Sequence, residues 1–517
     1  MGESTVAPRR AWPHETIDQA VRRRARDRPS EVAVVGPALT LTWRELDEAA
    51  DRAAGLLAEN GVGPGDLVGW LGQNDIGYPV VLLATWRRRA GMVGMNWRLP
   101  DHDLRAACQE IGLTHCVASQ AFADRAAEIS KDAFSVSVMA QDSLPWTDRP
   151  RAEALEPQAD DPAMLFFTSG STGVPKAVPL GRLSNELTVA NPNGHGISAG
   201  SRQLIVPPVF HLAGSIWVQY GLLYGTTQIF ISDTSPKGIV DALARYEITH
   251  AVFVPTLIRA IVDQIRAEPT PLPAFRHLAY GASPITQALL REAMEVLDCE
   301  FCQVFGMSEI GGTVSFLLPE DHVLTGEKSG RLASAGRLAE GVEIRVRDLV
   351  TGGDLPSGRS GELWVRAPFM ADGYFNRPQA TEGVFQDGWL NTRDIGYLDA
   401  DGYLYVEGRS DDMIVTGGEN VHPGEVENVI AQLPQVVECA VYGAPDEKWG
   451  LRVSAAVVGR TPDLTEADID AHCRERLAGY KCPKEIRLVP ALPRTPTGKI
   501  IRKRLHQETA PSPEAGT

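Results

Sequence analysis

Short apolar runs and amphipathic stretches alternate over the first 330 or so residues of the chain. The apolar runs have the length of buried strands, which are predicted at residues 67–71, 114–118, 164–167, 203–206, 228–231, 251–254 and 301–304. The stretches between them have helical periodicity, and one begins at Thr42, which forms a capping-box pattern with Glu45. Alternating strands and helices predict an α/β fold with mainly parallel sheets flanked by helices.

The pattern changes after about residue 330. Glycine and proline turns now separate short strand-like segments, which predicts a β-rich subdomain of antiparallel strands. A last block from about residue 413 has an α+β pattern of its own, with elements predicted at residues 423–433, 437–442, 453–458 and 466–477. We place a boundary at residues 408–412, between a large N-terminal domain, residues 1–408, and a small C-terminal domain, residues 413–517.

Length and charge narrow the class of protein. The 517 residues exceed the roughly 250–300 at which a single core stops growing, so at least two domains are expected. With 66 acidic and 50 basic residues the net charge is −16, which argues against nucleic acid or an anionic membrane as the main partner. The basic runs at residues 22–24 and 87–89 are interpreted as solvated helix faces. We expect no integral membrane segment and no signal peptide, because the apolar runs are too short.

Seven cysteines form a sparse, odd set for this length and favour a reducing cytoplasm. Cys299 and Cys302 make a lone C-x-x-C pair. No second pair follows at zinc-site spacing and the segment is strand-like, so packing in the core is the favoured interpretation.

The strand at residues 164–167 ends abruptly in hydroxyls, two glycines and a lysine. Such a turn can wrap a polyphosphate, because glycines let backbone N–H groups approach, hydroxyls donate and the lysine adds charge. It is not the usual P-loop, since only two residues separate Gly170 from Gly173 and Ala177 follows Lys176. Taken alone, the turn could equally be a solvated loop.

Further motifs follow in a fixed order. They are Tyr280-Gly281-Ala282-Ser283-Pro284, Phe305-Gly306-Met307-Ser308-Glu309, Asn391-Thr392-Arg393-Asp394-Ile395-Gly396, Gly408-Arg409-Ser410-Asp411-Asp412, Gly417-Gly418-Glu419-Asn420 and Pro493-Arg494-Thr495-Pro496-Thr497-Gly498-Lys499. Together with the glycine-rich turn, this set over residues 164–505 resembles the adenylate-forming (ANL) superfamily, which includes acyl-CoA synthetases, peptide-synthetase adenylation domains and luciferases. The acyl-CoA synthetase branch is the best match.

The resemblance implies an ATP-dependent, two-step reaction with Mg²⁺, in which a carboxylate first forms an acyl-adenylate and a thiol then displaces AMP. It implies that Glu309 is a magnesium ligand, that Phe305 stacks on adenine and that Arg409 donates near the ribose hydroxyls accepted by Asp394. The other implied ATP-binding residues are Thr168, Ser169, Gly170, Ser171, Thr172, Gly173, Lys176, Gly281, Ala282, Ser283 and Ser308. Phe305 and Ser308 stand where the family often has Tyr and Thr, which keeps the ring and the hydroxyl.

Two further roles are implied for the C-terminal domain. Lys499 matches the catalytic lysine, whose ammonium would bridge the attacking carboxylate and the α-phosphate; alone, it would pass for a surface lysine near a frayed terminus. Asp411 matches a hinge at residues 409–412 about which a mobile C-terminal lid rotates between half-reactions. The rotation would exchange the lysine loop for Gly417, Gly418 and Glu419, which would line a channel for the pantetheine arm of CoA.

The acid is expected to be bulky and hydrophobic: fatty, aryl, steroid or terpenoid. His211, counted here with the catalytic residues, stands where amino-acid-activating relatives place an aspartate, so an amino acid substrate is disfavoured. A purely structural histidine is the other interpretation. The surrounding residues assigned to the acid pocket are apolar or small: Phe210, Val254, Gly281, Gly306, Met307 and Gly311.

CoA is the first choice of acceptor, since no carrier-protein segment fits into the residues after Lys499. An enzyme that hands its acyl-adenylate to a carrier protein or to a separate partner enzyme is the main alternative. Luciferase-like oxidation, a non-catalytic AMP-binding regulator and a kinase are less favoured, and a homodimer is compatible with the sequence. One departure from the family is Gly181-Arg182, where relatives often have Thr-His.

Overall fold

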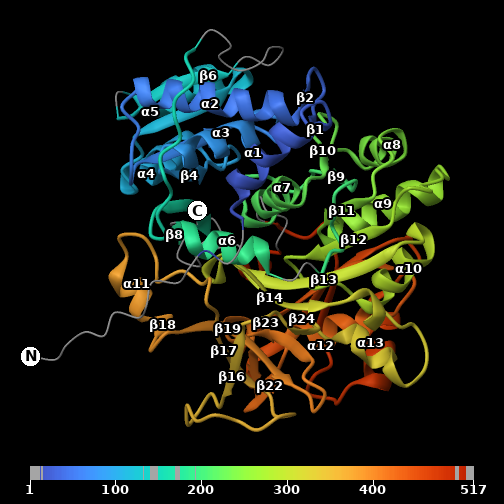
Figure 1. Cartoon of the computed structure of the whole chain (residues 1–517). Helices are drawn as coiled ribbons and strands as arrows, with labels where there is room; N and C mark the ends of the chain where they lie inside the picture. Colours follow the sequence, from blue (N-terminus) through green and yellow to red (C-terminus); the bar gives the residue numbers. More distant parts are fainter. Residues whose placement is uncertain are drawn as a thin grey trace, which may run out of the picture.

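The computed structural model describes residues 12, 15–131, 133–139, 149–168, 175–191, 194–494 and 500–507. Within them the chain forms four sheets, two large and mainly parallel and two small and mainly antiparallel (Figure 1). The predicted α/β fold with a β-rich subdomain and a smaller α+β C-terminal part is confirmed.

The first large sheet has six strands. Its order is β6 (Ser135–Met139), β5 (His115–Ser119), β3 (Leu67–Leu71), β4 (Gly91–Gly94), β7 (Pro162–Thr168) and β8 (Lys176–Gly181). All neighbours are parallel except β7 and β8, which form an antiparallel pair. The helices of this part of the chain are α1 (Ile17–Asp27), α2 (Trp43–Glu59), α3 (Gly77–Arg87), α4 (Asp101–Glu110), α5 (Ala123–Ser130) and α6 (Arg182–Ala190).

The second large sheet has nine strands. Its order is β15 (Arg337–Leu338), β14 (Gly312–Leu317), β13 (Glu300–Met307), β12 (His277–Gly281), β11 (His250–Phe253), β9 (Arg202–Leu204), β10 (Thr227–Ile229), β1 (Val32–Val35) and β2 (Thr40–Thr42). The strands from β13 to β1 are parallel. Helices α8 (Pro236–Arg245), α9 (Pro255–Ala267) and α10 (Gln287–Leu297) share one core with this sheet, whereas α7 (Leu212–Tyr224) packs in the core that also holds α1, α2 and α3.

The two smaller sheets follow in sequence. One contains β16 (Glu343–Arg347), β17 (Gly361–Arg366), β19 (Trp389–Leu398), β18 (Phe385–Gln386) and β20 (Leu404–Arg409), with α11 (Pro378–Glu382) nearby in the chain. The other contains β22 (Glu419–Val421), β21 (Ile414–Thr416), β24 (Gly450–Gly459), β23 (Val436–Asp446) and β25 (Glu485–Leu488). This last sheet has its own hydrophobic core with α12 (Pro423–Ile430) and α13 (Glu466–Arg476), and α14 (Arg502–Gln507) ends the described chain.

The local signals at helix starts are confirmed. Thr42 accepts a hydrogen bond from the backbone of Glu45, whose carboxylate in turn accepts from the backbone of Thr42. The same reciprocal cap at Thr16 starts α1. A Thr/Ser side chain at this position satisfies N–H groups that the helix itself leaves without partners.

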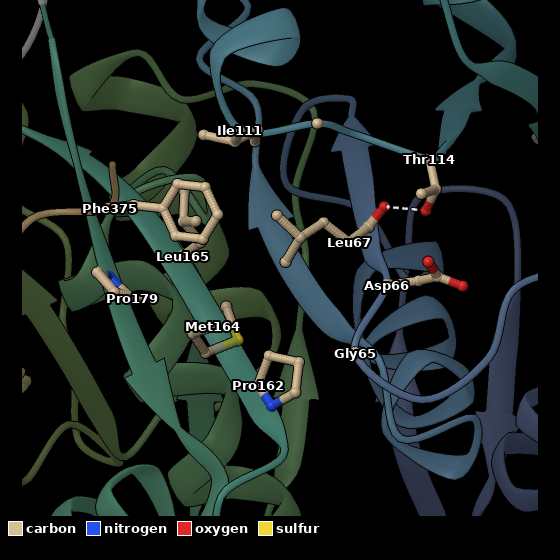
Figure 2. Close-up of a pocket in the computed structure, with 11 residues that line it drawn as sticks. Gly65, Asp66, Leu67, Ile111, Thr114, Pro162, Met164, Leu165, Pro179 and Phe375 are labelled. Atoms are coloured by element: carbon tan, nitrogen blue, oxygen red, sulfur yellow. Dashed lines mark hydrogen bonds between the residues drawn. The ribbon is translucent and has the colours of Figure 1, made fainter. Parts of the chain in front are cut away.

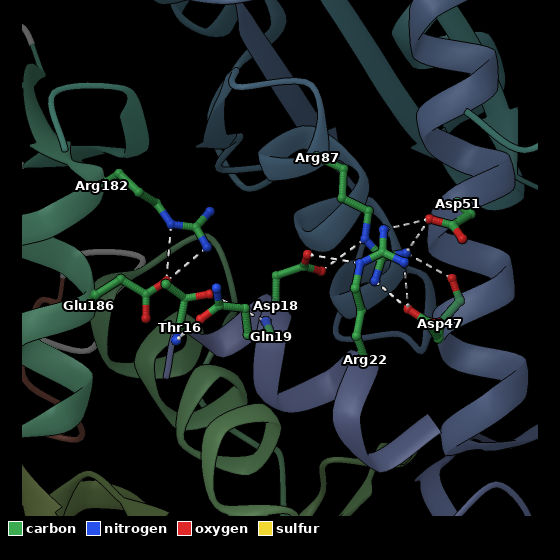
Figure 3. A network of polar contacts seen from close by, with 9 residues as sticks. All are labelled: Thr16, Asp18, Gln19, Arg22, Asp47, Asp51, Arg87, Arg182 and Glu186. Carbon is green, nitrogen blue, oxygen red and sulfur yellow. Dashed lines mark hydrogen bonds and ion pairs between the residues drawn. The ribbon is translucent and has the colours of Figure 1, made fainter. Parts of the chain in front are cut away.

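The interpretation of the two arginine runs as solvated faces is wrong for one member of each run, Arg87 and Arg24. The Arg87 side chain is completely buried, and it forms ion pairs with Asp18 at 2.8 Å, Asp47 at 2.5 Å and Asp51 at 2.9 Å (Figure 3). Arg24 is also buried and donates to the carbonyl oxygens of residues 222 and 223. Sequence periodicity does not distinguish a solvated arginine from one whose partners come from other helices, and these partners come from α1, α2 and α7.

The cysteines behave as small core residues. All seven are free thiols, and Cys302 is fully buried in the core between the nine-stranded sheet and the β-rich subdomain. Burial raises the pKa of Cys302. Among the residues described, no helix is both long and apolar enough to cross a membrane.

The Arg87 network predicts a large effect on stability. Burial alone would raise the pKa of Asp18, but attraction to Arg87 and Arg22 outweighs it and holds the pKa below 3.8. Arg87→Met removes the buried cation and leaves the three carboxylates with only the partly exposed Arg22. We expect it to lower the free energy of unfolding by about 3–5 kcal/mol, measured by urea denaturation. The contribution of Asp18 is present above pH 3.8 and is lost as the pH falls through the lowered folded-state pKa.

Arg22 provides the control for this measurement. It pairs with Asp51 at 2.9 Å and Asp18 at 3.3 Å, but its side chain is 30% exposed. Arg22→Met should lower the free energy of unfolding by about 1 kcal/mol or less. Equal effects of the two substitutions would show that burial does not set the strength of this network.

Candidate active site

The site residues predicted from the sequence gather at the carboxyl ends of parallel strands. Thr168 ends β7, Gly281 ends β12, and Val254 directly follows β11. Phe305 and Met307 lie in the last residues of β13, the parallel neighbour of β12. In open α/β sheets this edge is where ligands bind.

The carboxyl edges of the two large sheets touch. After β3, the Asn74 side-chain amide donates to the carbonyl oxygens of Ile205, Val206 and Pro207 at 3.2, 3.0 and 2.9 Å, and its oxygen accepts from the backbone of Val209 at 3.0 Å. The loop that it holds follows β9 and leads to His211. At the end of β4, a side chain on Gly94 would lie 2.7 Å from the backbone of residue 210, so the two edges approach within backbone contact.

Three polar side chains cross between the sheets at this edge. Lys176, the first residue of β8, places its ammonium 4.8 Å from the ring centre of Tyr374. The Tyr374 hydroxyl donates to Glu309 at 2.9 Å. Glu309 lies in a 3-10 turn directly after β13, so one tyrosine links the predicted phosphate-binding lysine to the predicted magnesium ligand.

The environment of Tyr374 keeps its hydroxyl protonated. Burial, and next the negative charge of Glu309, raise the pKa of Tyr374, while Arg393 and Arg409 oppose the shift. The hydroxyl is therefore a permanent donor to the carboxylate near neutral pH. This hydrogen bond to Oε1 orients the carboxylate of Glu309.

Asp394 and Arg409, the two residues predicted to lie at the ribose, are in contact. Asp394 lies on β19 opposite Arg409 at the end of β20, and their side chains form an ion pair at 3.3 Å. Asp394 is buried, whereas the Arg409 side chain is about half exposed. The Arg409 guanidinium also donates to the carbonyl oxygen of Thr392 at 3.3 Å, which holds it over the strand.

Two residues in the predicted ATP motifs have left-handed backbone conformations, which residues other than glycine rarely adopt. Ala282 has φ +66° directly after β12, and Arg393 has φ +59° before Asp394. Such conformations store of order 1 kcal/mol each and gather at functional sites. Gly281 needs its lack of a side chain, since a Cβ there would lie 2.2 Å from the carbonyl oxygen of Val304.

The residues assigned to the acid pocket occupy the same edge. The ring centres of Phe210 and His211 are 4.4 Å apart, and His211 precedes the first turn of α7. Met307 pairs with Gly312 across β13 and β14, which brings the turn containing Ser308 and Gly311 back onto the sheet. These positions surround the carboxyl ends of β9, β11, β12 and β13.

The cavity drawn in Figure 2 lies elsewhere. Its volume is about 160 Å³, and it is lined by residues such as Leu67 and Pro162 at the amino ends of β3 and β7 (Figure 2). A larger open groove of about 850 Å³ runs past Ser184 and the Glu343–Arg366 ion pair on the β-rich subdomain. Neither contains the strand ends described above.

The predicted CoA-channel residues form the turn between β21 and β22. Gly417 has φ +59° and a Cβ there would lie 2.6 Å from the indole ring of Trp449, so this turn requires glycine. Asp411, the predicted hinge residue, lies in a 3-10 turn after β20, and its half-exposed side chain pairs with Arg393 at 3.4 Å.

Some predicted residues lie outside the described part of the chain. They are Ser169, Gly170, Ser171, Thr172 and Gly173 of the glycine-rich turn, and Lys499. The flanks of both segments are described: Thr168 pairs with Lys176, and Arg494 pairs with Ile500.

Sequence reasoning missed Tyr374 and Asn74. Both lie in loops without a recognisable pattern, and their roles depend on partners far along the chain. The structure also explains why this chain has Gly181-Arg182 where relatives often have Thr-His. Arg182 is buried, and its guanidinium lies 4.0 Å from the centre of the Trp86 ring. It also pairs with Glu186 at 2.8 Å (Figure 3). Glu186 in turn accepts from the backbone of Ile17 at the start of α1.

Comparisons with known proteins identify the family. The AMP-binding enzyme family matches residues 21–375, and the AMP-binding enzyme C-terminal domain matches residues 425–499. A fatty acid–[acyl-carrier-protein] ligase, ScoC, of Streptomyces coeruleorubidus is 32% identical over 506 residues, which are 95% of this chain and 96% of the relative. A feruloyl-CoA synthase of an Amycolatopsis species is 35% identical over 491 residues, 93% of this chain and 96% of the relative.

Among solved structures, the o-succinylbenzoate CoA synthetase MenE of Bacillus subtilis in complex with ATP and a magnesium ion has a TM-score of 0.80. It is 30% identical, and the match covers 94% of this chain and 98% of that one. The chain therefore belongs to the AMP-binding enzyme family, and its resemblance to the adenylate-forming superfamily is confirmed. The predicted enzyme class, an AMP-forming acid–thiol ligase that uses ATP, Mg²⁺ and CoA, is confirmed with it.

The Tyr374–Glu309 hydrogen bond predicts a specific defect. Tyr374→Phe keeps the ring under Lys176 but removes the donor that orients the carboxylate. We expect the Mg²⁺ concentration that half-saturates ATP–pyrophosphate exchange to rise about 10-fold, the usual effect of losing a partner of a metal ligand. Tyr397→Phe is the control, because the Tyr397 ring stacks on that of Tyr405 with ring centres 4.9 Å apart. It should leave the half-saturating Mg²⁺ concentration unchanged. An unaltered Mg²⁺ dependence in Tyr374→Phe would contradict the role given to Glu309.

Proposed function

We propose that this enzyme activates a bulky hydrophobic carboxylic acid with ATP and transfers the acyl group to CoA. The observation that carries the proposal is the Lys176–Tyr374–Glu309 arrangement, which joins a cation and a carboxylate from two sheets at one edge. The Asp394–Arg409 pair supports it, because a buried carboxylate beside a guanidinium suits the hydroxyls of a ribose.

The first half-reaction brings two anions together. An oxygen of the substrate carboxylate attacks the α-phosphorus of ATP, the bond from that phosphorus to the bridging oxygen breaks, and pyrophosphate leaves. Lys176 neutralises phosphate charge, and the free oxygen of Glu309 is a suitable hard ligand for Mg²⁺. The metal, when bound, supplies further neutralisation of the phosphate oxygens.

The second half-reaction requires a path for the thiol. The CoA sulfur attacks the acyl carbon, the bond to the AMP oxygen breaks, and the thiol proton passes to solvent. We propose that Lys499 serves the first step only, and that rotation about Asp411 replaces its loop by the Gly417–Gly418 turn for the second.

The contacts beside the proposed hinge are weak enough for rotation. Arg393 pairs with Asp411 at 3.4 Å and Arg460 pairs with Asp263 of α9 at 3.7 Å, and the side chains of both pairs are 38–52% exposed. Exposed ion pairs contribute about 0–1 kcal/mol each. The proposed boundaries are residues 1–408 for the N-terminal domain, 409–412 for the hinge and 413–517 for the lid.

The proposed substrate class rests on the composition of the strand ends. Phe210, Val254 and Met307 are apolar, while Gly281 and Gly306 leave space. His211 offers no permanent negative charge for an amino acid's ammonium group. The names of two relatives, a fatty acid ligase and a feruloyl-CoA synthase, agree with an apolar chain or an aryl group.

Transfer to an acyl-carrier protein is the second candidate. The carrier-protein ligase from Streptomyces matches nearly the whole chain, as the CoA-dependent relatives do. We further propose a cytoplasmic location, which the seven free thiols support.

ATP–pyrophosphate exchange over a panel of fatty, aryl, steroid and terpenoid acids tests the proposal. We expect exchange to depend on one of these acids, and mass spectrometry to show its CoA thioester after CoA is added. If the acyl group is found only on an added carrier protein, the acceptor is the carrier protein and not CoA. Absence of exchange with every acid would refute the adenylation itself.

The role of Lys499 gives a second prediction. Lys499→Ala should reduce ATP–pyrophosphate exchange at least about 10²-fold, because one preorganised charge contact is lost. Thioester formation from supplied acyl-adenylate and CoA should be nearly unchanged, since the second step does not use this lysine. Lys503→Ala, four residues on and exposed in α14, is the matched control. Equal losses in both half-reactions would contradict the alternation of loops.

A further inference from the structure

A second group of chemically reactive side chains is buried away from the nucleotide site. His195 comes from the loop after α6, His277 begins β12, and Cys302 lies on β13. One ligand atom from each lies within 4.8 Å of the other two, and the three residues are 4%, 2% and 0% exposed. Side chains from three separate segments thus converge where no solvent reaches them.

The histidines are oriented as metal ligands are. The buried Nε2 of His277 makes no hydrogen bond within the described part of the chain. Its Nδ1 faces the carboxylate of Glu300 at 3.8 Å, beyond hydrogen-bond length but close enough for attraction. A histidine that binds a metal through one nitrogen commonly directs the other to a carboxylate.

Both rings are buried, and burial lowers the pKa of His195 to about 3 and that of His277 to about 4. His250 stacks on His277 with ring centres 5.5 Å apart, but its Nδ1 is already 2.7 Å from the Thr249 hydroxyl. It therefore supports the ring of His277 and is not counted as a ligand.

We propose that His195, His277 and Cys302 bind one Zn²⁺ ion. Two nitrogens and one sulfur are a donor set typical of zinc, and the thiol proton leaves to solvent as the zinc–sulfur bond forms. The Cys302 thiolate offsets part of the charge of the ion, and the Glu300 carboxylate, whose side chain is 69% exposed, adds a negative charge beside His277. Among described residues no further His, Cys, Asp or Glu joins the group, so the protein supplies three ligands.

The proposed zinc site would stabilise the strands that carry the predicted acid pocket. His277 and Gly281 lie on the same face of β12, because side chains alternate along a strand. His277 is the first residue of β12 and Gly281 the last, about 13 Å further along the strand. The proposed ion therefore lies at the amino end of β12, and the predicted acid pocket lies at its carboxyl end. The ion ties the loop of His195 to β12 and β13.

Metal analysis of the full-length enzyme tests this proposal. The untagged protein, purified without chelators, should contain about one zinc ion per chain by mass spectrometry, and Cys302→Ser should contain less than about one tenth of that. Cys299→Ser is the matched control, because Cys299 belongs to the same C-x-x-C pair but not to the buried group, and it should retain zinc.

A spectroscopic measurement keeps the test valid if a variant misfolds. Wild-type apoprotein reloaded with Co²⁺ should show a thiolate-to-cobalt charge-transfer band, which Cys302→Ser lacks and Cys299→Ser keeps. The proposal is overturned if the wild-type apoprotein takes up neither Zn²⁺ nor Co²⁺ in stoichiometric amount, or if Cu⁺ alone is bound. Zinc that survives in both Cys302→Ser and His277→Gln would also overturn it.

Discussion

The active site depends on contact between the carboxyl edges of two sheets. Neither sheet alone carries a complete set of the predicted groups: Thr168 and Lys176 belong to the six-stranded sheet, whereas Phe305 belongs to the nine-stranded one and Glu309 directly follows its strand β13. ATP and a carboxylate repel each other, so positive charge, metal ligand and acid pocket must lie together before binding. Asn74 and Tyr374 are the side chains that join these edges.

Buried polar contacts hold the layer behind this edge in place. Arg87 ties α3 to α1 and α2 through three carboxylates, and Arg182 ties α6 to the start of α1 through Glu186. An ion in the interior is tolerated only where partners surround it, so these contacts allow few alternative packings of the helices between the sheets. The strand ends proposed to bind substrates are correspondingly fixed. The ion pair of Asp411 with Arg393 is exposed, in contrast to the buried ion pairs of Arg87 and Arg182. This difference in burial distinguishes the fixed helices from the part of the chain that is proposed to rotate.

The group formed by His195, His277 and Cys302 follows the same physical rule. A ring nitrogen without a hydrogen bond, such as Nε2 of His277, is unfavourable in a dry interior unless a metal or a hydrogen bond satisfies it. Zinc at this place would take no part in the proposed reaction and would tie the loop of His195 to β12 and β13. The lone C-x-x-C pair contributes only Cys302, because Cys299 is not among the converging side chains.

The sequence by itself determined the elements whose signals are local. Hydrophobic runs found β3, most of β7 and β11 and half of β13, and the cap at Thr42 found the start of α2, because such signals involve neighbours within a few residues. The ordered motifs also indicated the family and the reaction. The sequence did not reveal β4 (Gly91–Gly94), a short strand with two glycines.

Only the tertiary structure decided which polar residues are buried and what they touch. Arg87 looks like a surface arginine until Asp18, Asp47 and Asp51 arrive from two other helices. Tyr374 has no motif, yet it connects Lys176 with a carboxylate 65 residues away in sequence. The reason is physical: propensity and periodicity act through near neighbours, whereas charge pairing and ligand geometry depend on distances that exist only after the sheets have packed together.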